Sequence, residues 1–238
     1  MRMELKRSRT DYTRTLDVGL RKYMLSVFFH MTAGLLITAV VAYIMSLSNA
    51  FILFLTLHPT VSILLSLIPF GVAQYLLYRI NRISAESAKA LFFIYAALLG
   101  ALLSVIVAFS SASILISTFF VTSSMFLAMV VYGYSTEKDL TSWGSFLFMG
   151  LVGIVIAGIV NIFIMNDMAS FVISAIGVLV FTGLTAYDIQ RIKSYYLESD
   201  HSEIGEKKAI FGALLLYLDF INLFLCLLRL LKFLSRRD

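Results

Sequence analysis

Long apolar stretches without a charged side chain alternate with short polar segments along this chain. Residues 23–78, 90–136, 140–166 and 168–187 contain no Asp, Glu, Lys or Arg. Because a helix needs about 20 predominantly apolar residues to cross a bilayer, the breaks in this pattern predict seven spans. These are residues 24–47, 59–80, 88–109, 112–134, 142–164, 168–190 and 207–231. The short apolar segment SNAFILFLTLHP between the first two spans is either interfacial or an extension of a neighbouring helix.

Continuous apolar runs of this length predict helices rather than a barrel, whose strands alternate with a period of two. The sequence is 60% hydrophobic and 14% charged, far from the average of soluble proteins. We therefore expect an all-α integral membrane protein that forms a seven-helix bundle. Its expected parts are an N-terminal arm (1–23), a single membrane domain (24–231) and a short basic tail (232–238). Small residues at Gly144, Gly150, Gly153 and Gly158 indicate close helix packing.

Lysine and arginine are concentrated in the segments that lie on one side of the membrane if every predicted span crosses it. They occur in the N-terminal arm, in the segment 79–89 and in the segment 191–208, whereas the loops near 47–58 and 109–112 carry no charge. This asymmetry predicts a cytoplasmic N-terminus. It also explains the net charge of +5 without a nucleic-acid partner. Short loops and a single cysteine fit a prokaryotic inner membrane protein whose first span is retained.

The last segment departs from the charge pattern. If it crosses the membrane fully, the basic residues of the tail lie outside, against the usual bias; if it folds back, they stay inside. These residues are Arg229, Lys232, Arg236 and Arg237. We favour a full span that is central in the bundle, surrounded by the other six helices.

Two acids stand in or beside apolar segments. Asp219 interrupts the otherwise uncharged run 209–228, and Asp188 lies near the end of the preceding span. A charged side chain at the bilayer centre costs roughly 3 kcal/mol, so such an acid indicates a functional site. If the two carboxyl groups meet, repulsion and burial make one of them keep its proton to an unusually high pH. The pair would then be a proton switch.

Structural roles are the alternatives for these residues. Asp188 lies three residues before Arg191 and would form an ordinary interfacial ion pair. Asp219 would pair with Arg79 simply to fix helix packing. Arg79 and Arg82 would be interfacial anchors.

A cation such as calcium prefers several oxygen ligands, and two aspartates supply at most about four carboxylate oxygens, so other groups must complete any site. Asn222, one turn beyond Asp219, and Tyr187 are candidates to help bind a cation. The three histidines show no metal-binding spacing, and the sequence contains no nucleotide-binding motif. We therefore expect no cofactor.

Several segments resemble the hallmark sequences of the Bax inhibitor-1 family, also called the transmembrane Bax inhibitor motif family. They are MTAGLLITAVVAY (31–43), VVYGYSTEKDLTSWGSFLFMGLVG (130–153), FTGLTAYDIQRIK (181–193) and LYLDFINLFLCLLRLL (216–231). The resemblance implies seven helices with the last one surrounded by the others, and a pH-sensitive cation leak, chiefly of calcium. In eukaryotic members it also implies suppression of cell death.

The resemblance assigns roles to four residues. Asp188 and Asp219 match the two aspartates described as a proton-sensing pair in this family. An arginine near the cytoplasmic end of the second helix is thought to latch onto that pair, and Arg79 is the best-placed candidate, with Arg82 second. The glutamate that some prokaryotic relatives carry earlier in that helix is absent from SILLSLIPFGVAQ here.

Two other functions remain open. Aspartates on two membrane helices resemble the arrangement in intramembrane aspartyl proteases, but Asp219 stands in YLDF rather than in the GxGD pattern of those enzymes, so we expect no enzymatic activity. The second alternative is a non-transporting regulator that binds other membrane proteins or stress and cell-death partners. For the leak itself, the expected partners are membrane lipid, calcium and protons.

Overall fold

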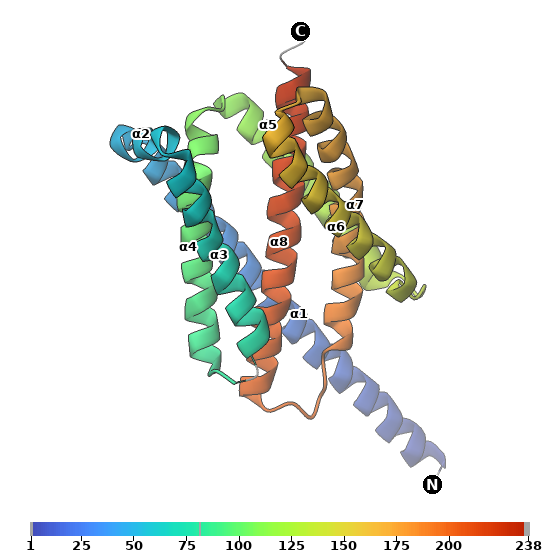
Figure 1. Ribbon diagram of the computed structural model, residues 1–238. Helices are drawn as coiled ribbons and strands as arrows, with labels where there is room; N and C mark the ends of the chain where they lie inside the picture. The colour runs from blue at the N-terminus through green and yellow to red at the C-terminus, as the bar shows by residue number, and fades with distance from the viewer. Residues whose placement is uncertain (1, 81, 236–238) are drawn as a thin grey trace. The chain divides into compact units, whose positions relative to one another are not determined.

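The computed structural model describes residues 2–80 and 82–235, with side chains from Val18 onward. Within that part of the chain every regular element is an α-helix (Figure 1). The helices are α1 (Arg2–Ser46), α2 (Asn49–Leu57), α3 (Pro59–Arg79), α4 (Ala85–Ala108), α5 (Ala112–Ser135), α6 (Thr141–Ile164), α7 (Asp167–Ser194) and α8 (Ser202–Leu234). The all-α prediction is therefore confirmed.

Seven of these helices are long and apolar enough to cross a membrane. They are Val18–Ser46 within α1, and the whole of α3, α4, α5, α6, α7 and α8. This confirms the seven predicted spans, whose ends agree with the helices to within about six residues. The undecided segment after the first span forms a separate helix, α2, which begins at its cap Ser48, whose side chain accepts a hydrogen bond from the Phe51 N–H.

The chain divides into two compact units. The first contains the residues up to Ser104 together with Ile192–Leu214, and the second contains Val105–Arg191 together with the residues from Leu215 onward. Helices α7 and α8 each contribute to both units. Asp188 and Asp219 belong to the second unit, which therefore holds the whole of the candidate pair.

Glycines allow the helices of the second unit to approach closely. Gly133 on α5 lies against the backbone of Ala186 on α7, and Gly144 on α6 lies against the ring of Tyr187. A side chain on either glycine would have no room. Close packing is thus confirmed for Gly144, and also for Gly150, where an added Cβ would lie 3.0 Å from Val180.

The packing role predicted for Gly153 and Gly158 is wrong. Apart from the nearby backbone of α6 itself, no atom of the described residues lies within 4 Å of the position that a Cβ would occupy at either residue. Both are in the C-terminal half of α6, a helix whose side chains are mostly exposed. The sequence signal was misleading because a small residue permits a close helix contact but does not create one.

The end of α8 is tied to the same side of the second unit as the α4–α5 loop. Lys232 Nζ donates to the carbonyl oxygen of Phe109 in that loop (3.2 Å), and Phe233 packs on Phe171 in the first turns of α7 with ring centroids 4.7 Å apart. α8 is also one unbroken helix of 33 residues. The last segment is therefore one continuous helix, and its full crossing of the membrane stays a prediction.

Helix α8 is the most buried of the candidate spans. In its most apolar window 67% of the positions are buried, whereas the values for the other spans lie between 6% and 39%. A last helix that the other six surround requires burial of this kind. The central position itself remains a prediction.

Candidate functional site

The two aspartates lie together inside the second unit. Asp188 on α7 is 8% exposed and Asp219 on α8 is 5% exposed. Each carboxyl group acts electrostatically on the other, so the two acids are close neighbours. The structure thus brings together the two acids that the sequence singled out.

The surroundings of the pair are unequal. Asp188 lies one turn before Arg191 on the same helix and is attracted electrostatically to that guanidinium. On Asp219, the Oδ2 atom is buried and has no hydrogen-bond partner among the described residues. An unpaired buried oxygen is costly if the group is charged. The site therefore offers ionic support to Asp188 and much less to Asp219.

The two further candidate ligands flank the pair without completing a metal site. Tyr187 is half-buried with its ring on Gly144, and Asn222 Nδ2 donates to the carbonyl oxygen of Leu218 (2.8 Å). Among the described side chains there is no group of three His, Cys, Asp or Glu that could hold a metal ion. Any calcium bound here would rely on backbone carbonyls or water for its remaining ligands.

The predicted latch residues lie in the first unit. Arg79 is in the last turn of α3 and half-buried, whereas Arg82 follows that helix and is exposed. The aspartates lie in the second unit, so the latch stays a prediction. Within the second unit, the Arg191 guanidinium attracts Asp188.

A glutamine that the sequence analysis passed over holds α7 beside the pair. Gln190 Oε1 accepts a hydrogen bond from the backbone N–H of Leu140 (2.9 Å), and its Nε2 donates to the carbonyl oxygen of Lys138 (2.8 Å). Both partners belong to the α5–α6 loop. A single polar residue at the end of an apolar run is ordinary, so no signal in the sequence pointed to this role.

Buried hydroxyl groups were a second feature that the sequence analysis did not identify. Thr118 and Thr122 on α5 are fully buried and donate to the carbonyl oxygens of Ile114 and Thr118, respectively (2.7 Å each). Ser174 on α7 is equally buried, and its Oγ has no partner in the described part of the chain. The spacing of four residues between the two threonines was the one available hint, because it places them on one helix face.

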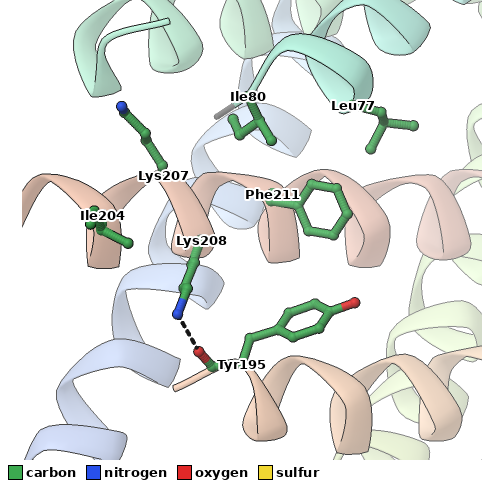
Figure 2. Close-up of a pocket in the computed structure, with 7 residues that line it drawn as sticks. All are labelled: Leu77, Ile80, Tyr195, Ile204, Lys207, Lys208 and Phe211. Atoms are coloured by element: carbon green, nitrogen blue, oxygen red, sulfur yellow. Dashed lines mark hydrogen bonds between the residues drawn. The ribbon is translucent and has the colours of Figure 1, made fainter. Parts of the chain in front are cut away.

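The first unit contains a cavity of about 570 Å³. Figure 2 shows it beside the start of α8, lined by Ile204 and Phe211 of that helix, by Leu77 of α3 and by Ile80, the residue that follows α3. Lys208 Nζ turns away to the carbonyl oxygen of Tyr195 (2.9 Å) and to Asp200 Oδ2 (2.6 Å). This lysine is thus already engaged in fastening the α7–α8 loop.

Comparison with known proteins gives a consistent result. The profile of the family described as "Inhibitor of apoptosis-promoting Bax1" matches residues 20–237. A protein of Rickettsia prowazekii is 44% identical over 96% of this chain and 96% of its own length. The inner membrane protein YbhL of Escherichia coli K12 is 42% identical over 93% and 95%. A membrane protein of Streptococcus pyogenes serotype M3 is 35% identical over 92% and 95%.

Proposed function

The chain belongs to the Bax inhibitor-1 family, and from this premise we propose that it is a pH-sensitive leak for cations, chiefly calcium, gated by Asp188 and Asp219. The proximity of these two buried carboxyl groups carries the proposal. Burial and like-charge repulsion disfavour two ionised carboxylates side by side, so we expect the pair to hold a proton in one of its states. The pair therefore has two chemically distinct states, and one proton converts the first into the second.

Loss of this proton raises the electrostatic energy of the pair. The pair then holds two negative charges, and each buried ion costs several kcal/mol in lost hydration. Because like charges also repel, the carboxyl groups must separate, attract a cation or bind an arginine. This conversion of a proton signal into movement or cation attraction is what a gate requires.

An arginine latch is the second part of the proposed gate. A guanidinium donates two parallel charge-assisted hydrogen bonds to a carboxylate, so Arg79, or Arg82 in its place, would close the mouth on an ionised pair. Protonation weakens such a bridge and also weakens the negative field that attracts cations. These two effects oppose each other, and the calcium flux measured as a function of pH decides whether acid raises or lowers the leak.

Calcium would cross the site as the permeant ion. Asp188 and Asp219 supply carboxylate oxygens, and Asn222 would contribute Oδ1, since its nitrogen donates to Leu218. Tyr187 is the remaining candidate ligand. An interior-negative potential drives each charge inward by about 2.3 kcal/mol per 100 mV. Transport therefore needs no nucleotide, and we propose no enzymatic activity for the chain.

The proposed location is a prokaryotic inner membrane with the N-terminus in the cytoplasm. The seven spans require a membrane, and the relative YbhL carries the name of an inner membrane protein. The distribution of lysine and arginine gives the orientation.

Calcium flux into proteoliposomes that contain a calcium-sensitive dye tests the leak. The purified protein should pass calcium with a rate that depends on pH, and Asp219→Asn should flatten that dependence because asparagine cannot titrate. Asp167→Asn is the matched control, since Asp167 lies exposed in the first turn of α7. The control should keep the wild-type pH profile.

Two results would overturn the proposal. One is a wild-type flux no greater than that of empty liposomes. The other is an unaltered pH profile in Asp219→Asn, which would remove the pair from gating even if the protein conducts calcium.

A further inference from the structure

We propose that the cavity between the end of α3 and the start of α8 binds an anionic phospholipid, with the head-group phosphate on Lys207 and an acyl chain along Leu77 and Phe211. The described residues that line this cavity all belong to the first unit. The inference goes beyond the proposed leak and does not depend on it. The proposed orientation enters only in naming the leaflet, which is the cytoplasmic one.

The cavity has the size and the walls of a ligand site. Its volume of about 570 Å³ lies within the range of about 300–1,000 Å³ that is usual for sites of small ligands. Its described lining combines apolar side chains from both helices with two lysines and contains no acidic residue. An apolar wall with basic groups at one end fits an amphiphile with a negatively charged head.

The cavity straddles the boundary between the apolar and the polar parts of both helices. On α3 the charge-free run continues to Tyr78, so Leu77 lies on the apolar side. On α8 the charge-free run begins at Ala209, so Phe211 lies on the apolar side and Lys207 on the polar side. A phospholipid holds its acyl chains and its phosphate at these two levels of the bilayer. A water-soluble anion would reach the lysine but leave the apolar wall uncovered.

Lys207 is suited to hold the phosphate. Its side chain is 17% exposed, whereas Glu203, the carboxylate that it faces at 3.1 Å, is 59% exposed. Exposed ion pairs one helical turn apart contribute little to stability, and an ammonium group has three N–H donors. Figure 2 shows Lys207 extending to the same side of α8 as Ile80. A phosphate can therefore bind Lys207 beside Glu203 or in its place.

Lys208 has a supporting role. Its Nζ donates to the carbonyl oxygen of Tyr195 (2.9 Å) and to Asp200 Oδ2 (2.6 Å), so two of its three donors hold the α7–α8 loop. Tyr195 in turn packs on Phe211, with ring centroids 6.0 Å apart. Lys208 thus fixes one wall of the cavity and leaves the head group to Lys207.

The surrounding charge favours an anion. Glu206, which precedes Lys207 in the chain, faces Lys89 of α4 at 3.7 Å. Eight lysines and arginines and five acids occur among the described side chains of the segments 18–22, 79–89 and 192–208. Basic pockets between membrane helices at the cytoplasmic end bind anionic head groups. The first turns of α8 add the positive end of a helix dipole.

Lipid binding to the purified full-length protein tests the site. Native mass spectrometry of the delipidated protein in detergent counts bound lipids as phosphatidylglycerol or phosphatidylcholine is added. The anionic phosphatidylglycerol should bind more tightly than the zwitterionic phosphatidylcholine. Lys207→Gln should lower the affinity for phosphatidylglycerol about tenfold, the effect of losing one charge-assisted contact.

Two further variants separate the parts of the proposed ligand. Lys89→Gln is the matched control, since Lys89 also faces an acid of α8 but is not among the lining residues, and it should keep the wild-type affinity. Ile204→Trp fills part of the apolar wall without changing the charge, and it should also weaken the binding of phosphatidylglycerol. Ile204 is 43% exposed, so a larger side chain there does not disturb the core.

Three results would overturn the proposal. One is an equal affinity of the wild-type protein for the two lipids. Another is an equal loss of affinity in Lys89→Gln and Lys207→Gln, which would mean that the lipid responds to surface charge in general. The third is displacement of phosphatidylglycerol by inorganic phosphate, which would assign the cavity to a small water-soluble anion.

Discussion

The Asp219 carboxyl group has fewer polar or charged partners than the Asp188 carboxyl group. Its Oδ2 is buried without a partner in the described structure, whereas Asp188 has Arg191 one turn away. A charge on Asp219 therefore gains little from its surroundings until a cation reaches it. In the proposed mechanism, Asp219 is therefore the acid that would gain more from an incoming arginine or calcium ion.

The latch can be tested with two single substitutions. Arg79 is half-buried at the end of α3 and Arg82 is exposed, so Arg79 is better suited to reach a buried carboxylate. We expect Arg79→Ala to raise calcium leak at neutral pH by about tenfold, which corresponds to the loss of about 1.4 kcal/mol of charge-assisted bonding. Dye-loaded proteoliposomes provide the measurement.

Arg82→Ala is the control for the latch and should leave the leak near the wild-type value. A raised leak in Arg82→Ala alone would transfer the role to that residue. An unchanged leak in both variants would mean that neither arginine closes the pore.

Asp139 makes a pH-dependent contribution at the start of α6. Hydrogen bonds from the Thr141 side chain and backbone lower the pKa of the Asp139 carboxyl. A lowered pKa in the folded state means that the stabilisation is present above the unfolded value of about 4 and is lost as pH falls through the folded value. Asp139→Ala should therefore lower the melting temperature more at pH 6 than at pH 3.

Asp139→Asn separates charge from hydrogen bonding at this cap. Asparagine keeps an acceptor oxygen but does not titrate, so its effect on the melting temperature should not vary over the same pH range. Equal losses for Asp139→Ala at both pH values would show that the ionised carboxylate contributes nothing.

At the level of elements, the contact between α5 and α7 depends on Gly133. An added methyl group would meet the backbone of Ala186, which cannot move aside as a flexible side chain can. We expect Gly133→Ala to destabilise the protein by about 1–3 kcal/mol, the usual cost of overpacking. Thermal unfolding in detergent measures the change.

Gly153→Ala is the matched substitution on α6, where an added methyl group meets nothing within 4 Å. It should be neutral or slightly stabilising, since alanine favours a helix more than glycine does. A loss of stability in Gly153→Ala as large as that in Gly133→Ala would mean that backbone contact is not the cause.

The spans could be predicted because the requirement for apolar length is strict, but the full helices could not. α8 begins at Ser202, five residues before the predicted span, and α1 extends back to Arg2. Charged residues such as Glu203 and Lys207 allow a helix to continue beyond the bilayer, and hydropathy does not report on that continuation. The resemblance of whole segments supplied the family, which no single span could have done.

The candidate site also contains residues that the sequence could identify and one that it could not. An acid inside an apolar run is expensive, so Asp188 and Asp219 could be identified without coordinates. Gln190 stands at a boundary where polar residues are common, and its partners are backbone atoms about 50 residues earlier in the chain. Sequence patterns describe side chains and cannot show which distant backbone groups lack a hydrogen-bond partner.

For the whole molecule, α8 ends on the side where the α4–α5 loop lies within the second unit. Lys232 donates to Phe109 in that loop, although positive residues are usually cytoplasmic. The exception has a local explanation, because the C-terminal end of a helix carries a partial negative charge that attracts cations. The N-terminal arm and the segments 79–89 and 191–208 together carry more lysine and arginine than the C-terminal tail. We therefore expect the N-terminus inside and the C-terminal end of α8 outside.

Single cysteines in a Cys226→Ser background test this orientation. A membrane-impermeant maleimide applied to intact cells should label Ala112→Cys and Ser235→Cys, which lie exposed at the expected outer side. It should label Glu198→Cys in the α7–α8 loop only after permeabilisation, because an odd number of spans separates the two sides. Labelling of Ser235→Cys together with Glu198→Cys would contradict a full crossing by α8. Labelling of Glu198→Cys alone in intact cells would mean that the protein is inserted in the opposite direction, since Ala112 and Ser235 would then both face the cytoplasm.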